Sequence, residues 1–99
     1  MDNLLDLILK IEKRPGLWIG GTDIEALGHF LNGYCWAKSE GNERYGTWLF
    51  IDFTRYLAEK YEDERTYNWV GLIRENEPNG KSTDAFFRLL REYIADRTQ

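Results

Sequence analysis

Residues 47–61 read TWLFIDFTRYLAEKY, and this stretch decides whether helices alone build the chain. Its first part, Trp48-Leu49-Phe50-Ile51, is a continuous apolar run, which suits a strand as well as a buried helix. After it, apolar side chains return at helical spacing, at Phe53, Tyr56, Leu57 and Tyr61. A helix is also favoured by charged residues three to four positions apart, namely Arg55, Glu59 and Lys60. We therefore predict a helix over residues 47–61, and a strand at residues 48–51 stays open.

Two further helices are expected downstream of this stretch. Residues 62–65 (EDER) break the apolar pattern, and a short helix then holds Trp69, Val70, Leu72 and Ile73. Residues 77–80 (EPNG) are typical of a turn. Ser82, Thr83 or Asp84 then caps a last helix. Its inward face is expected to hold Phe86, Leu89, Leu90, Tyr93 and Ile94.

Two more helices are expected upstream. The first has Leu4, Leu5, Ile8, Leu9 and Ile11 at helical spacing; Asp2 or Asn3 caps it, and Pro15-Gly16 stops it. Residues 17–19 are interpreted as an apolar link and residues 22–25 (TDIE) as a capping box. The second helix places on one face Ile24, Leu27, Leu31, Tyr34 and Cys35. With a loop at residues 39–46, the chain is predicted to be an all-α, compact single domain of about five helices over residues 1–99.

Composition narrows the classes of function. Acidic residues outnumber basic ones 17 to 13, and no basic cluster is larger than Lys13-Arg14, so direct binding of nucleic acid is not expected. No apolar stretch approaches the roughly 20 residues that cross a bilayer, which argues against a membrane protein. The N-terminal residues lack the basic start of a signal peptide, and the single Cys35 cannot form an internal disulfide. These features predict a cytoplasmic protein.

The residues that could carry out catalysis each have a plainer explanation. His29 and Cys35 lie six residues apart on one predicted helix, about 240° apart around its axis, so they do not form a nucleophile pair. Asp52 and Glu59 share one helix face and could form a carboxylate pair. Surface acids at that spacing are common, so the signal is weak. Metal-binding, phosphate-binding and nucleophile motifs are absent from the sequence. We predict no enzyme activity, no cofactor and no metal; a small enzyme using Asp52, His29 or Cys35 is the less favoured hypothesis.

Three short motifs suggest a family. They are KRPGLWIGG at residues 13–21, FLNGY at residues 30–34 and DAFFRLL at residues 84–90, in an order that covers nearly the whole chain. The chain resembles small bacterial immunity proteins of polymorphic toxin and contact-dependent growth inhibition systems, although Leu17 replaces the usual Met of the first motif. That motif alone also resembles a stretch near the start of DNA gyrase B subunits, whose nucleotide-binding motifs are missing here. The longer resemblance implies an antitoxin that binds and neutralises a cognate toxin domain, with a nuclease as the expected target.

The acidic charge is compatible with this function, because nucleases bind phosphate backbones with basic surfaces and an acidic inhibitor associates with them faster. The expected partner is therefore a basic protein toxin domain. The contact surface is predicted where acids and aromatics mix after residue 58, at Glu59, Tyr61, Glu62, Asp63, Glu64, Tyr67, Trp69, Glu75 and Glu77. Two alternatives stay open: the acids form a solvated loop and the aromatics belong to the core, or the chain is a general protein-protein adaptor or assembly subunit.

Overall fold

Helices form the regular structure of this chain. The computed structural model describes residues 3–21, 23–40, 45–78 and 80–97, and none of these ranges contains a strand. The all-α fold class predicted from the sequence is confirmed. The chain divides into two compact units, Met1–Trp48 and Leu49–Gln99, which are described separately below. Among the described residues, no helix has the length and apolar content that a membrane-spanning segment requires.

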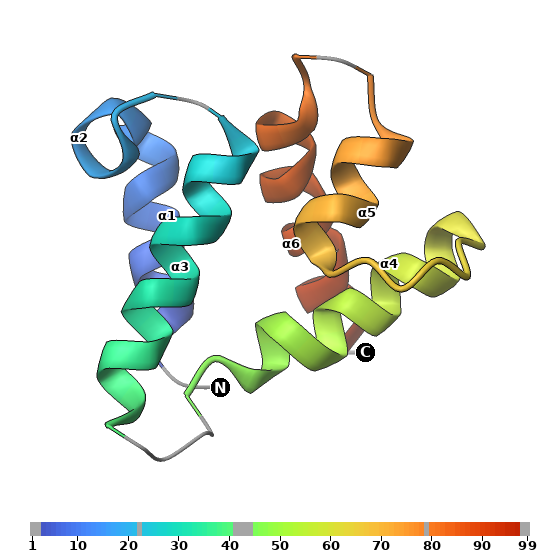
Figure 1. The fold of residues 1–99 in the computed structure, drawn as a ribbon, viewed down its shortest axis with the longest axis horizontal. Helices are drawn as coiled ribbons and strands as arrows, with labels where there is room; N and C mark the ends of the chain where they lie inside the picture. The colour runs from blue at the N-terminus through green and yellow to red at the C-terminus, as the bar shows by residue number, and fades with distance from the viewer. Residues whose placement is uncertain (1–2, 22, 41–44, 79, 98–99) are drawn as a thin grey trace. The chain divides into compact units, whose positions relative to one another are not determined.

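The first unit contains three helices (Figure 1): α1 (Leu4–Lys13), α2 (Pro15–Ile19) and α3 (Ile24–Ser39). The predicted apolar link at residues 17–19 is wrong, because these residues belong to α2. Pro15 stops α1 as expected but also starts α2, since its fixed φ suits the first helical position. The Trp18 ring then packs edge-on against Phe30 of α3, with 6.3 Å between ring centroids. This contact gives the short helix a reason to form.

The predicted helix caps of this unit are partly corrected. Asn3 stands at the N-cap of α1 without a side-chain capping bond, and Asp2 lies outside the described residues. The capping box at residues 22–25 begins with Thr22, which also lies outside them. Asp23 caps α3, because its carboxylate accepts a hydrogen bond from the Glu25 backbone N–H at 3.0 Å.

Buried aliphatic side chains on α1 and α3 form the core of the first unit. They are Leu4, Ile8, Ile11, Ile24, Leu27, Leu31 and Cys35. Leu9 shares the helical spacing of these residues but is 37% exposed. Gly46 packs directly on this core, with a φ of +76° that favours glycine. A Cβ at this position would lie 2.6 Å from the Cys35 Sγ and 3.3 Å from a Leu4 methyl.

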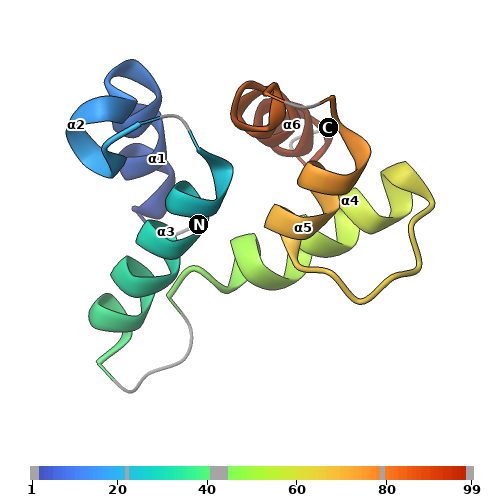
Figure 2. The same ribbon diagram turned by 45° about the horizontal axis from the view of Figure 1, so that its top comes forward.

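The second unit begins with the stretch that the sequence left open. Residues 48–51 are helical, not a strand, but they belong to the six-residue π-helix Trp48–Phe53, which runs into α4 (Thr54–Tyr61). The Thr54 hydroxyl donates to the Leu49 carbonyl oxygen five residues earlier, at 3.4 Å. Two helices follow, α5 (Trp69–Asn76) and α6 (Ser82–Arg97), and α5 contacts both α4 and α6 (Figure 1, Figure 2).

Aromatic rings form the centre of the second unit. Phe86 of α6 packs against Trp69 at 4.7 Å and against Phe53 at 5.9 Å between centroids. Phe53 also meets Tyr93 edge-on at 5.4 Å. Buried aliphatic residues fill the remaining space: Leu57, Leu72, Ile73, Leu89 and Leu90. The four apolar residues expected in the short helix lie in α5 and are buried. The inward face predicted for α6 is confirmed, except that Ile94 is only half-buried.

The start of α6 differs from the prediction. The helix begins at Ser82, so Ser82, Thr83 and Asp84 form its first turn and are not its cap. The preceding turn is closed by the Lys81 backbone N–H, which donates to the Pro78 carbonyl at 3.0 Å. Asn79 of the predicted turn lies outside the described residues.

Candidate functional site

The predicted contact residues gather where α4 ends. Glu62 has left-handed backbone angles, φ 51° and ψ 43°, and its N–H donates to the Glu59 carbonyl at 3.2 Å. The Asp63 N–H donates to the Ala58 carbonyl at 3.0 Å. These two bonds form a Schellman motif, which usually has glycine at the left-handed position. The sequence here places a negatively charged Glu at that position, although both the backbone and the helix dipole disfavour it.

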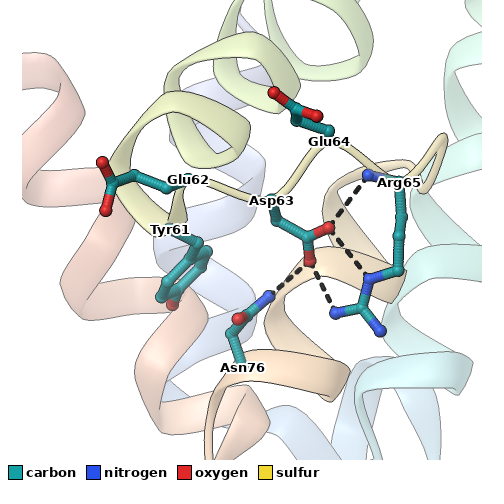
Figure 3. Close-up of a pocket in the computed structure, with 6 residues that line it drawn as sticks. All are labelled: Tyr61, Glu62, Asp63, Glu64, Arg65 and Asn76. Carbon is teal, nitrogen blue, oxygen red and sulfur yellow. Dashed lines mark hydrogen bonds and ion pairs between the residues drawn. The ribbon is translucent and has the colours of Figure 1, made fainter.

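The residue that follows, Asp63, is turned inward. Its carboxylate accepts from the Arg65 backbone N–H at 3.0 Å and from the Arg65 guanidinium at 2.9 and 2.7 Å. The Asn76 side-chain amide adds a fourth bond at 2.9 Å (Figure 3). Because every donor stabilises the charged form, the pKa of the Asp63 carboxyl lies well below its ordinary value. Asp63, Arg65 and Asn76, called the Asp63 cluster below, fix the loop between α4 and α5 to the end of α5.

Arg65 is held on several sides. Besides its paired bonds to Asp63, its guanidinium lies 3.7 Å from the Glu75 carboxylate. It also covers the Tyr67 ring, with 4.9 Å from the guanidinium carbon to the ring centroid. The Tyr67 side chain in turn rests against Gly71 of α5, where a Cβ would lie 2.9 Å from the Tyr67 Cβ. Tyr67 is therefore enclosed by Arg65 and Gly71 but keeps 37% of its surface exposed.

A second set of contacts ties α4 to α6. The Tyr61 hydroxyl donates to the Glu77 carboxylate, whose other oxygen accepts from Arg88 at 3.1 Å. Burial of the phenol and this hydrogen bond to a carboxylate raise the pKa of Tyr61 well above its ordinary value. Glu77 is thus engaged inside the fold.

Three carboxylates remain outside these networks. The side chains of Glu59, Glu62 and Glu64 are exposed and have no hydrogen-bond or ion-pair partner within the described ranges; we call them the outer carboxylates. Glu62 and Glu64 point away from the Asp63 cluster in Figure 3. Beside them lies a depression of about 350 Å³ that is open to solvent. It is lined by Tyr61, Glu62, Asp63, Glu64, Arg65 and Asn76.

The nine predicted contact residues therefore fall into groups. Trp69 is fully buried in the core, so the prediction that it is a contact residue is wrong and the alternative of a core aromatic holds for it. The Asp63 side chain is only 5% exposed and faces inward. Glu75 pairs with Arg65 and Arg74. Exposed and open to a partner are the outer carboxylates and Tyr67.

Sequence reasoning missed three residues that build this site: Arg65, Gly71 and Asn76. An acid followed two positions later by a basic residue is a local signal that could have indicated the Asp63–Arg65 pair. Asn76 is 13 residues from Asp63, and its contact depends on how α5 packs, which no local pattern shows.

The two candidate catalytic residues of the first unit do not form a pair. On α3, His29 is exposed while Cys35 is buried. Asp52 lies in the π-helix, 3.9 Å from the Arg97 guanidinium. No group of three or more His, Cys, Asp or Glu in the described part of the chain is arranged to hold a metal ion. None of the three candidates lines the depression beside the outer carboxylates.

Comparisons of the chain with protein-family models, with curated proteins and with solved structures found no match.

Proposed function

We propose that this chain binds a basic protein surface through the outer carboxylates, and that it is an immunity protein that neutralises a toxin domain. One observation carries the first part. Asp63, Glu75 and Glu77 are paired within the fold, whereas Glu59, Glu62 and Glu64 between and beside them are exposed and have no partner among the residues that the structure describes. The paired acids build the loop, and the unpaired acids are left for an external cation.

The position of Glu62 supports the same proposal. A left-handed C-terminal position at a helix end favours glycine for its backbone and a basic residue for its charge. Glu62 satisfies neither preference, so local stability does not account for it. Residues held in disfavoured conformations are enriched at functional sites, and a carboxylate offered to a partner fits this position. Because Glu40 has the same geometry at the end of α3, the backbone angles agree with the proposal and the exposed carboxylates carry it.

The step from a basic partner to a toxin domain rests on the sequence motifs. Within the fold, Phe86, Phe87, Leu89 and Leu90 of the third motif are buried, so this motif builds the core. The outer carboxylates lie outside all three motifs. A family that shares its core motifs and varies a charged surface can meet different toxins on one scaffold. An acidic surface suits a nuclease, whose phosphate-binding groove is basic.

Binding of a defined probe tests the proposal. The probe is the C-terminal domain encoded by the reading frame immediately upstream, and its association with the full chain is measured by surface plasmon resonance at several salt concentrations. The variant Glu59→Gln/Glu62→Gln/Glu64→Gln should associate at least about tenfold more slowly at low salt and depend less on salt, because steering is lost.

A matched control separates local from overall charge. The variant Asp6→Asn/Glu40→Gln/Asp84→Asn removes the same three charges from exposed positions elsewhere on the chain and should bind nearly as the wild type does. Equal loss in both variants would contradict a specific contact surface. Tight binding to a domain that is harmless to cells would instead favour the adaptor hypothesis.

A further inference from the structure

We propose that Tyr67 is the preordered aromatic anchor of this contact surface, and that Gly71 and Asp63 are positioning residues that hold it in place. The inference rests on the proposed function, since an anchor requires a partner. It changes the role of Asp63 from a contact residue to an internal support, and it assigns a role to Gly71, which carries no charge and no side chain.

Gly71 makes room for the Tyr67 side chain. Glycine is unfavourable inside a helix, and this one is buried in α5, where alanine would ordinarily be preferred. The reason lies in its contact with Tyr67. An alanine Cβ would lie 2.9 Å from the Tyr67 Cβ and 3.1 Å from its Cγ, so the backbone of α5 or of Tyr67 would have to shift, and the ring with it. Glycine therefore stands where alanine would favour the helix, and it leaves space for the Tyr67 side chain.

Arg65 supports the ring as well, through a chain of charged and polar contacts. The Arg65 guanidinium lies over the ring at 4.9 Å from its centroid. Its orientation is set by two bonds to the Asp63 carboxylate, which is itself bonded to Asn76. The Asn76 amide also donates to the Leu72 carbonyl at 2.8 Å, so the whole chain of contacts is attached to α5. Residues 63–67 connect two helices. They are held at one end by the bonds of Asp63, in the middle by the contacts of Arg65, and at the other end by the contact of Tyr67 with Gly71.

This arrangement has a consequence for binding. A rotamer-rich side chain that orders on association reduces affinity, whereas a side chain ordered beforehand does not. Tyr67 combines a fixed position with substantial exposure, and the Arg65 that covers its ring lines the same depression as Glu62 and Glu64. Tyrosine is also among the residues enriched at the energetic centres of interfaces. We infer that the partner's basic side chains meet the outer carboxylates while an apolar part of its surface meets the Tyr67 ring.

A double-mutant cycle tests the proposal with the same upstream-encoded domain as probe. Tyr67→Ala and Gly71→Ala should each weaken binding by about tenfold, the scale on which the loss of an interface anchor is felt. In the double variant the Gly71→Ala substitution should cost almost no further affinity, because the ring whose position it disturbs is gone, although the Cβ that alanine keeps at position 67 still forces the backbone to shift. Gly33→Ala, at an exposed helical glycine with no atom within 4 Å of its added Cβ, is the control and should leave affinity unchanged.

A second readout uses the free protein. The Arg65 Nε–H should give a slowly exchanging signal in proton–nitrogen spectra, which Gly71→Ala shifts and Asp63→Asn abolishes. If Gly71→Ala does not fold, Arg65→Lys, which keeps the charge but not the planar stack, takes its place in the cycle. Full additivity of the two substitutions, or wild-type affinity for Tyr67→Ala, would overturn the anchor proposal while leaving binding by the outer carboxylates intact. Absence of binding by the wild type would refute the proposed function itself.

Discussion

Replacing Glu62 by glycine should make the protein more stable and a weaker binder. Relief of the left-handed conformation contributes about 1–2 kcal/mol, and removal of a negative charge from a helix C-terminus contributes about 0.3–1 kcal/mol. The greater freedom of glycine in the unfolded chain offsets about 0.5–1 kcal/mol. The free energy of unfolding should therefore rise by about 1 kcal/mol, because φ 51° at Glu62 costs glycine nothing.

Urea unfolding followed by tryptophan fluorescence measures this change, and surface plasmon resonance with the upstream-encoded domain measures binding. Glu40→Gly is a close control, because Glu40 also ends a helix, α3, in the left-handed region with φ 47°. It should bring a similar gain in stability with unchanged affinity. Glu62→Gln keeps the backbone conformation and removes the charge, so it should recover only the smaller, electrostatic part of the gain.

Two results would refute this reasoning. If Glu62→Gly is no more stable than the wild type, the left-handed conformation does not cost what its backbone angles imply. If it is more stable and binds the probe with unchanged affinity, Glu62 is not retained for binding. Only Glu59 and Glu64 would then remain as contact carboxylates.

Other consequences concern the core and the shifted pKa values of Asp63 and Tyr61. Gly46→Ala should lower the free energy of unfolding by about 2–4 kcal/mol, because it combines a strained φ with a clash against the Cys35 sulfur; Cys35→Ala should restore part of the loss in urea unfolding. The hydrogen bonds that depress the pKa of the Asp63 carboxyl stabilise the fold at pH values above its ordinary pKa, and this stability is lost as the pH falls below that value. Asp63→Asn should therefore flatten the acid limb of a stability–pH curve. The raised pKa of Tyr61 contributes stability below about pH 10 that is lost as the pH rises further, so Tyr61→Phe should flatten the alkaline limb.

Much of the fold follows from helical periodicity. The inward positions of α6 were predictable, since Phe86, Leu89, Leu90 and Tyr93 recur at the spacing of one buried face. The π-helix at residues 48–53 was not predictable, because an apolar run looks the same whether its backbone hydrogen bonds span four residues or five. The helix of residues 15–19 was missed for another reason: Pro15 stops one helix and starts another, and the sequence shows only the stop.

The sequence predicted the region of the candidate site, but not which of its side chains face inward and which face solvent. The alternation of acids and aromatics after residue 58 indicates a polar corner, yet it does not separate an inward Asp63 from an outward Glu62 or Glu64. That separation depends on the Schellman motif and on Asn76 from the next helix. Trp69 was taken as one of several surface aromatics because its burial by Phe86 is a long-range contact.

Survival of cells tests the central claim most directly. Cells that express the upstream-encoded domain are plated with no second gene, with the wild-type chain, or with the Glu59→Gln/Glu62→Gln/Glu64→Gln variant, at matched expression. The proposal predicts that the wild type restores viability, that the triple variant protects poorly, and that the Asp6→Asn/Glu40→Gln/Asp84→Asn control protects fully. Equal death with and without the wild-type chain would contradict it.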